Sequence, residues 1–116
     1  MTPAVLVVGD ANLDLLLRGD VVPRFGQAEQ LLQGLDLTLG GSAAIVAAGL
    51  AALDTPALLA ARVGADLFGR TVLDALRERG VDTTHVTTDD AVPSGLSVIL
   101  DRRWRPARSG ALAEEL

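Results

Sequence analysis

The spacing of hydrophobic and polar positions changes along the chain, and these changes predict strands that alternate with helices. The run AVLVVGD at 4–10 is apolar, β-branched and closed by Gly-Asp, which predicts a parallel, central strand buried on both faces. The segment GLDLTLG at 34–40 instead alternates leucine with polar residues, the period of a strand with one face in water. Together with the less regular NLDLLLRGD at 12–20, it predicts a two-stranded antiparallel ribbon.

Two helices are expected, each placed between strands. Ser42 can act as the N-cap of a helix from about residue 43 to 53, which is apolar on every side and should therefore be buried. The segment PALLAARVG at 56–64 predicts the next strand, after which Asp66 caps an amphipathic helix that stops at Gly80. Two short strands then follow, at 84–90 and 95–101. This alternation favours an α/β fold with a doubly wound parallel sheet, into which the early ribbon is inserted.

The composition limits the chemistry and the partners of these 116 residues. All ten basic residues are arginine, so no lysine can serve a P-loop or a Schiff base, and without cysteine there is no thiol nucleophile. The net charge of -5 argues against general affinity for nucleic acid or for an anionic membrane surface. The opening MTPAVLVVGD has no basic region and too short an apolar stretch for a signal peptide or a membrane span, so a cytoplasmic protein is expected.

The segment GDANLD at 9–14 is the first candidate site, because ligands of open α/β sheets bind at the carboxyl ends of strands. Its polar side chains, Asp10, Asn12 and Asp14, can accept hydrogen bonds from hydroxyls or hold a cation. A calcium loop is excluded, since Leu15 stands where that loop needs glycine. The alternative, that these residues only make Asx turns, stays open on the sequence pattern alone.

Gly40 and Gly41 form the second candidate, because glycine lets a ligand approach the backbone at a helix N-terminus. On spacing alone, a tight turn into a buried helix is the favoured interpretation. The segment RRWRPAR at 102–108 has the mixture of arginine and tryptophan that can stack on and neutralise nucleic acid. In an acidic chain, a solvated tail is the favoured interpretation of that patch.

Four segments, taken in order, resemble the amino-terminal part of the PfkB carbohydrate kinases, the ribokinase-like family. They are VVGDANLDL, TLGGSAAIVAAGLAAL, ARVGADLFGRTVLDALRERGVDTTHV and VPSGLSVIL. The resemblance implies a ribokinase-like, Rossmann-like parallel sheet with helices on both faces and a small β-sheet lid. It covers about residues 4–101 and matches only the first portion of a family member, so a truncated single domain is expected. Its lid strands would run from about 13–18, 31–39 and 96–101.

The resemblance also implies an activity, the ATP-dependent transfer of a phosphoryl group to a sugar or nucleoside hydroxyl. Asn12 and Asp14 match residues that bind substrate hydroxyls, and Gly40 and Gly41, with Ser42 beside them, match the backbone that lies against the sugar. No catalytic, cofactor-binding or metal-binding residue is assigned. Where the family has asparagine in a Gly-Gly-x-x-x-Asn pattern, this chain has Ile45, so a typical sugar should bind roughly 5 to 150-fold more weakly.

ATP and Mg²⁺ are implied for complete family members, whose catalytic base and nucleotide site lie beyond the matching portion. Neither is expected to bind this chain well, and we expect a coupled ADP-release assay to detect no kinase activity from it alone. The alternative function is a non-catalytic, degenerate interaction protein that uses an exposed sheet for dimerisation. Self-association is therefore an expected property, with no nucleic acid and no membrane as partners.

Overall fold

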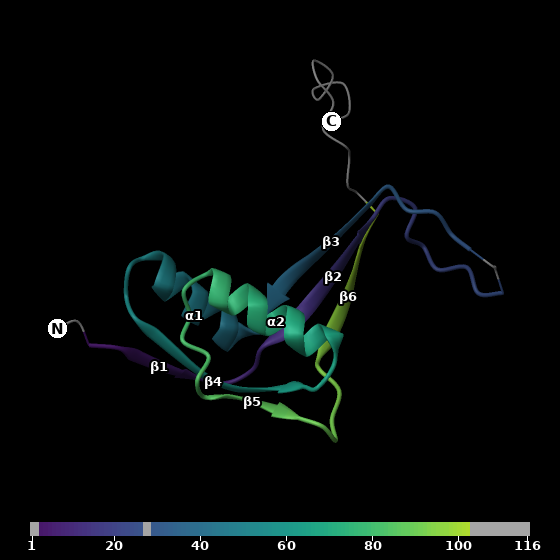
Figure 1. Ribbon diagram of the computed structural model, residues 1–116. Coiled ribbons are helices and arrows are strands. Elements are labelled where there is room, and N and C mark those ends of the chain that lie inside the picture. Colours follow the sequence, from purple (N-terminus) through teal and green to yellow (C-terminus); the bar gives the residue numbers. More distant parts are fainter. Residues whose placement is uncertain (1–2, 27–28, 103–116) are drawn as a thin grey trace, which may run out of the picture. The chain divides into compact units, whose positions relative to one another are not determined.

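The computed structural model describes residues 3–26 and 29–102 of the chain (Figure 1). Within these ranges the elements are, in order, β1 (Val5–Val8), β2 (Asn12–Arg18), β3 (Gly34–Gly40), α1 (Ser42–Ala52), β4 (Ala57–Gly64), α2 (Leu67–Glu78), β5 (Val86–Asp89) and β6 (Leu96–Asp101). The segment at 103–108, which holds most of the expected arginine and tryptophan patch, lies outside the described residues.

A parallel sheet with the order β1-β4-β5 is the centre of the α/β fold. Val7 pairs with Leu59 in the first ladder, and Ala61 pairs with Val86 in the second. The expected α/β class is confirmed, but the placement of the first strand is wrong for the described residues, because β4 is central and β1 lies at an edge. Leu6 and Val8 on β1 are 59% and 73% exposed, so this strand is not buried on both faces there.

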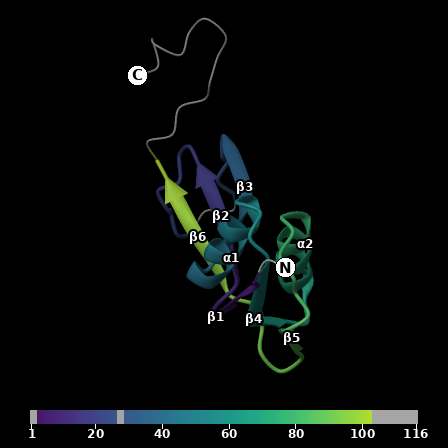
Figure 2. The same cartoon turned by 90° about the vertical axis from the view of Figure 1, so that its left-hand side faces the viewer.

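Both described helices cover the same face of this sheet (Figures 1 and 2). Helix α1 packs on β1 and β4, and α2 packs on β4. The connections β1–α1–β4 and β4–α2–β5 step across the sheet in one direction, and right-handed crossovers in one direction place their helices on one face. The resulting core is lined by Ala43, Ala44, Ala47, Leu59, Val63, Val72 and Leu76.

Helix α1 differs from the prediction in two respects: which residue caps it, and how many of its side chains are buried. The N-cap is Gly41, with φ 89° and no side-chain capping bond, so Ser42 is the first helical residue instead of the cap. The buried residues are three alanines, whereas Ile45 and Val46 are 55% and 53% exposed. The helix was expected to be buried on every side, but only one face of it packs against the core, through these alanines with Leu50 beside them.

Helix α2 confirms its prediction more closely. The side chain of Asp66 caps it by accepting a hydrogen bond from the backbone N–H of Gly69 at 2.8 Å. Gly80, with φ 84°, follows the C-cap and ends the helix in the left-handed conformation. Asp54, which follows α1, adopts φ 59°, a left-handed conformation that is uncommon for residues other than glycine.

A second, small sheet has the order β3-β2-β6. At the two ends of the pairing between β2 and β6, Leu13 N donates to Gly95 O at 3.2 Å and Gly19 N donates to Asp101 O at 3.2 Å. The parallel sheet and this small sheet together agree with the expected ribokinase-like class. Whether the second sheet acts as a lid stays a prediction.

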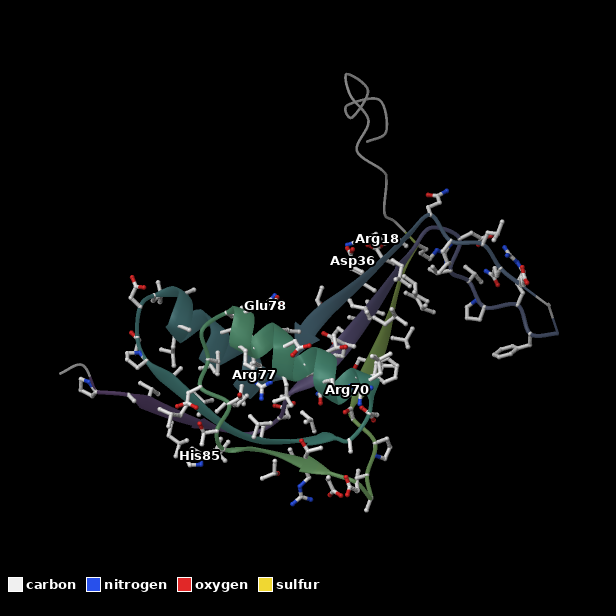
Figure 3. All side chains as sticks on the ribbon, in the orientation of Figure 1. Arg18, Asp36, Arg70, Arg77, Glu78 and His85 are labelled. Atoms are coloured by element: carbon white, nitrogen blue, oxygen red, sulfur yellow. The ribbon has the colours of Figure 1, made fainter. Side chains whose placement is uncertain are left out.

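The chain divides into two compact units. Among the described residues, the first unit contains 3–14 and 38–97, and the second contains 15–26, 29–37 and 98–102. In the second unit, Arg18 on β2 and Asp36 on β3 form an ion pair, and their side chains point toward each other in Figure 3. All residues expected to bind substrate belong to the first unit.

Candidate functional site

Asn12 and Asp14 present their side chains on the same face of β2. Because side chains alternate along a strand, Leu13 between them points the other way, and it is only 2% exposed in the core. Asn12 and Asp14 are both half-buried. The sequence predicted them just after the first strand, with a ribbon strand from about residue 13, and in the structure β2 begins at Asn12 and includes both residues.

Two glycines lie against these polar side chains, one on each neighbouring segment. A Cβ atom at Gly40 would come within 2.6 Å of Asp14 Oδ1, and one at Gly95 would come within 2.5 Å of Asn12 Oδ1. Any larger residue at either position would displace the polar group. We call Asn12, Asp14, Gly40 and Gly95 the polar floor.

Gly95 is the member of the polar floor that sequence reasoning missed. It lies in the VPSGL segment, which contributes to the family resemblance, but it reads as an ordinary turn residue beside proline and serine. Only the packing of β6 beside β2 brings Gly95 against Asn12. The signal in the sequence was thus a glycine directly before a predicted strand, with nothing to indicate its partner.

Asp10 closes the N-terminus of α1 from outside the helix. Its Oδ1 accepts hydrogen bonds from Ser42 Oγ at 3.2 Å and from Ala43 N at 3.4 Å, and its backbone carbonyl accepts from Ala44 N at 3.1 Å. The bond from the Ala43 amide is the largest of the effects that lower the pKa of Asp10. Asp10 therefore performs the capping role that was expected of Ser42.

Gly41 allows this close approach between Asp10 and the start of α1. A Cβ atom at Gly41 would lie 2.7 Å from the carbonyl oxygen of Asp10 and 3.0 Å from Ala11 Cα. Its φ of 89° also lies in the region that favours glycine. Packing therefore requires glycine at position 41, and ligand binding by Gly40, Gly41 and Ser42 stays a prediction.

Asp66 and Ser94 form a second network at the end of β4, which we call the clasp. Asp66 Oδ1 accepts from Ser94 Oγ at 2.7 Å, and Asp66 Oδ2 accepts from Ser94 N at 2.9 Å. Ser94 Oγ in turn accepts a hydrogen bond from Gly64 N at 2.8 Å. The Ser94 amide is the main cause of the lowered pKa of Asp66, followed by the amide of Gly69.

Asp66 was expected to cap the second helix, and the structure confirms the capping bond. Arg70, on α2 in Figure 3, adds a smaller electrostatic effect that also lowers the pKa of Asp66. A carboxyl held in its charged form by three hydrogen bonds is unsuited to donating a proton near neutral pH. His85, the single histidine, is exposed on the segment before β5 (Figure 3).

Residues 3–26 and 29–102 contain no group of three or more histidine or acidic side chains that could hold a metal ion. The N-termini of α1 and α2 are natural sites for phosphate, but carboxyls of this chain, Asp10 and Asp66, already accept their N–H groups. No reaction step is therefore assigned to a nucleotide within this part of the chain.

An apolar hollow of about 220 Å³ lies separately in the second unit. It is lined by Leu17, Val21, Pro23, Gln30, Leu32 and Leu100. Its one amide, Gln30 Nε2, already donates to the carbonyl oxygens of Asp20 at 2.9 Å and Val22 at 2.7 Å. The hollow therefore offers little to a hydroxyl-rich ligand.

The two capping carboxyls predict how stability changes with pH. Asp10 and Asp66 have pKa values below 3.8 in the folded chain, so the unfolded chain binds more protons in acid. Their stabilisation is complete above about pH 5, where the unfolded carboxyls are also ionised, and is lost as the pH falls through the unfolded and then the folded pKa values. We expect the thermal midpoint to drop between about pH 5 and 3, and to drop less steeply in Asp66→Asn than in Asp74→Asn, a change at an exposed helix position. Equal slopes in the two variants would contradict this assignment.

Comparison with known proteins agrees with the family resemblance. Residues 2–104 match the family model described as pfkB family carbohydrate kinase. The ribokinase of Haemophilus influenzae is 29% identical over 101 residues, which are 85% of this chain and 32% of that protein. The 2-dehydro-3-deoxygluconokinase of Thermoproteus tenax is 45% identical over 51 residues, 44% of this chain and 16% of that protein.

Among solved structures, the Arabidopsis thaliana ribokinase complexed with ribose and ATP is similar, with a TM-score of 0.79 and 29% identity. The match covers 86% of this chain and 32% of that one. The chain thus spans about a third of the length of these ribokinases. Across the part of the chain that the structure describes, no helix has the length and apolar character needed to cross a membrane.

Proposed function

Because the chain belongs to the pfkB family of carbohydrate kinases, we propose that its first unit binds the hydroxyls of a sugar or nucleoside that the complete protein phosphorylates. One observation carries this proposal. The carboxylate of Asp14 has no hydrogen-bond partner among the described residues, although it is half-buried beside Gly40. A half-buried carboxylate without a partner in the protein is open to solvent, and a ligand hydroxyl can replace the water that binds there.

The polar floor suits a polyol for three reasons. The two oxygens of Asp14 can accept hydrogen bonds from two adjacent hydroxyls and so fix the orientation of the ligand. The amide of Asn12 can both donate and accept, so it can bind a further hydroxyl in either sense. Gly40 and Gly95 carry no side chains, which lets the carbon skeleton of the ligand approach the backbone.

The phosphoryl transfer itself is proposed for the complete protein, since this chain spans about a third of its ribokinase relatives. ATP with Mg²⁺ would supply the phosphoryl group, held by residues other than those described. The contribution of this segment is to hold the acceptor hydroxyl in place, a positioning effect that accounts for much of phosphoryl-transfer catalysis. That the 116 residues are inactive alone stays a prediction.

The role of Asp14 is tested by replacing it with asparagine. Asparagine keeps the shape but lacks the charge, so we expect affinity for ribose, followed by NMR titration, to fall roughly tenfold or more. Asp74→Asn makes the same change of charge at an exposed position of α2 and should leave the affinity unchanged. Equal ribose affinity in wild type and Asp14→Asn, or no binding by the wild type across a panel of sugars and nucleosides, would refute the proposed function.

Ile45 provides a test in the opposite direction. It lies one helical turn after Gly41, to whose carbonyl oxygen its N–H donates at 3.0 Å, and its side chain is 55% exposed. The family resemblance implies that an asparagine at this position meets a ligand hydroxyl, and the hydrocarbon of Ile45 would leave that hydroxyl without a partner. We expect Ile45→Asn to raise the affinity for ribose by roughly 5 to 150-fold, corresponding to about 1 to 3 kcal/mol.

Val46→Asn is the matched control for Ile45→Asn. It removes a similar hydrocarbon at the next residue of the same helix, where the side chain is 53% exposed. Successive helical residues point about 100° apart, so the new amide would not face the same ligand group. A gain of affinity in both variants would mean that an added amide anywhere on this helix improves binding, so that the position of Ile45 is not special.

A second candidate function rests on the exposed residues of β1. Leu6 and Val8 leave an apolar surface on a strand that lies at the edge of the described sheet. Such an edge favours pairing with another strand, as a non-catalytic dimerisation protein would use it. Sedimentation at micromolar concentration separates the two functions, because a monomer that binds ribose supports the sugar-binding role and a dimer that binds none supports the alternative.

A further inference from the structure

We propose that Asp66 is a positioning residue for the ligand site, acting through Ser94 and Gly95 on the side chain of Asn12. This inference rests on the proposed function of the polar floor. It begins from the fact that Asp66 uses both carboxylate oxygens, whereas capping α2 needs only one. Oδ1 accepts from the Gly69 amide, and the two bonds from Ser94 are additional.

The first step fixes Ser94 in place. Its backbone N–H and its hydroxyl both donate to Asp66, at 2.9 and 2.7 Å, and its Oγ accepts from the Gly64 amide at 2.8 Å. Hydrogen bonds to a charged carboxylate are shorter and stronger than neutral ones. Ser94 is therefore held to the end of β4 and to the start of α2 at the same time.

The second step transmits this position to Gly95, the next residue. The Gly95 carbonyl accepts from Leu13 N at 3.2 Å, so Gly95 is fixed on one side by the clasp and on the other by β2. Its Cα faces Asn12 Oδ1, and a Cβ there would lie 2.5 Å from that oxygen. Movement of Gly95 would therefore open or close the space in which the Asn12 amide lies.

The third step concerns the orientation of the Asn12 amide. Asn12 Nδ2 donates to Asp10 Oδ2 at 3.5 Å, a long bond that holds the amide weakly. The close packing of Gly95 against the Asn12 side chain is then the main restraint on the position of Asn12 Oδ1. Displacing Gly95 leaves the amide free to rotate away from the geometry that would meet a ligand hydroxyl.

Asp66→Asn separates the clasp from the helix cap. Asparagine caps helices about as well as aspartate, because its Oδ1 can still accept from the Gly69 amide. Its NH₂ group would face the N–H of Ser94, so a bond between donor and acceptor becomes a contact between two donors. We expect the NMR signals of the Gly95 backbone amide and the Asn12 side-chain amide to shift or broaden in the free protein.

Asp82→Asn is the matched control. Asp82 also accepts an N–H and a hydroxyl bond from a single residue, Thr84, at 2.9 and 2.5 Å, but it follows Val81 after α2 and does not touch the polar floor. This variant should leave the signals of Gly95 and Asn12 unchanged. Thermal unfolding of both variants shows whether either has lost global stability.

Ribose titration provides the functional measurement. We expect Asp66→Asn to weaken ribose binding about tenfold, by analogy with the lower end of the loss seen when a residue that supports a metal ligand is removed. Asp82→Asn should bind ribose as wild type does. Unchanged Gly95 and Asn12 signals in Asp66→Asn would overturn the inference, as would shifted signals with unchanged ribose affinity. Absence of ribose binding in the wild type would instead count against the proposed function, while the signals of the free protein would still decide whether the clasp orients Asn12.

Discussion

Replacing Gly69 with alanine is expected to destabilise the chain by at least about 2 kcal/mol, although alanine is the better helix former. A Cβ atom at Gly69 would overlap the carbonyl oxygen of Gly64 and lie 2.9 Å from Ser94 Oγ. This carbonyl group belongs to the backbone at the end of β4. It cannot move aside without disturbing the clasp, because the N–H of Gly64 donates to Ser94 Oγ. The overlap therefore outweighs the gain in helix propensity.

Gly49→Ala is the control for Gly69→Ala. Gly49 also lies inside a helix, α1, but a Cβ atom there would meet nothing within 4 Å. Without an overlap, the helix propensity of alanine should stabilise the chain by about 0.5 to 1 kcal/mol. Urea unfolding measures both variants, and a shift of the same sign in the two would show that α2 does not pack on Gly64 as described.

Replacing Leu59 with alanine is expected to cost about 3 to 5 kcal/mol of unfolding free energy. Leu59 is fully buried on the central strand β4, where it pairs with Val7 and contributes to the core beneath the helices. Removing its side chain deletes buried hydrocarbon and leaves a cavity lined by residues of both helices. Since small domains are marginally stable, this variant should be largely unfolded at 37 °C.

Leu53→Ala makes the same change of side chain at a position that is 77% exposed. Exposed substitutions of this kind usually change stability by less than about 0.5 kcal/mol. Circular dichroism during urea unfolding compares the two. If Leu59→Ala unfolded at the same urea concentration as Leu53→Ala, the assignment of β4 as the buried central strand would be wrong.

The sequence predicted most elements because their signals are local. The alternation in the GLDLTLG segment, the capping by Asp66 and the stop at Gly80 each depend on residues within a few positions of one another. The predictions for the first strand and the first helix were wrong in burial. Apolar runs indicate that a surface prefers to be covered, but they do not say which element covers it, and α1 lies on one face of the sheet only.

The candidate site was predicted only in part, because some of its contacts join residues that are far apart in the sequence. Asn12, Asp14 and Gly40 were identified by family resemblance, and the structure places Asp14 against Gly40. Ser42 was given a capping role that Asp10 performs, because a residue on another segment can reach a helix N-terminus as well as the preceding residue can. Gly95 could not be found, since its partner Asn12 lies near the other end of the described chain.

The sequence by itself determined the α/β class, the family and the types of residue that could bind a polyol. Local periodicity, caps and ordered motifs carry this information because they act between neighbours in the chain. Only the tertiary structure decided that Gly40 and Gly95 flank the polar side chains of β2, and that Asp66 connects to this site through Ser94. Those contacts join residues far apart in the sequence, and their geometry depends on strand order and packing, which no short segment specifies.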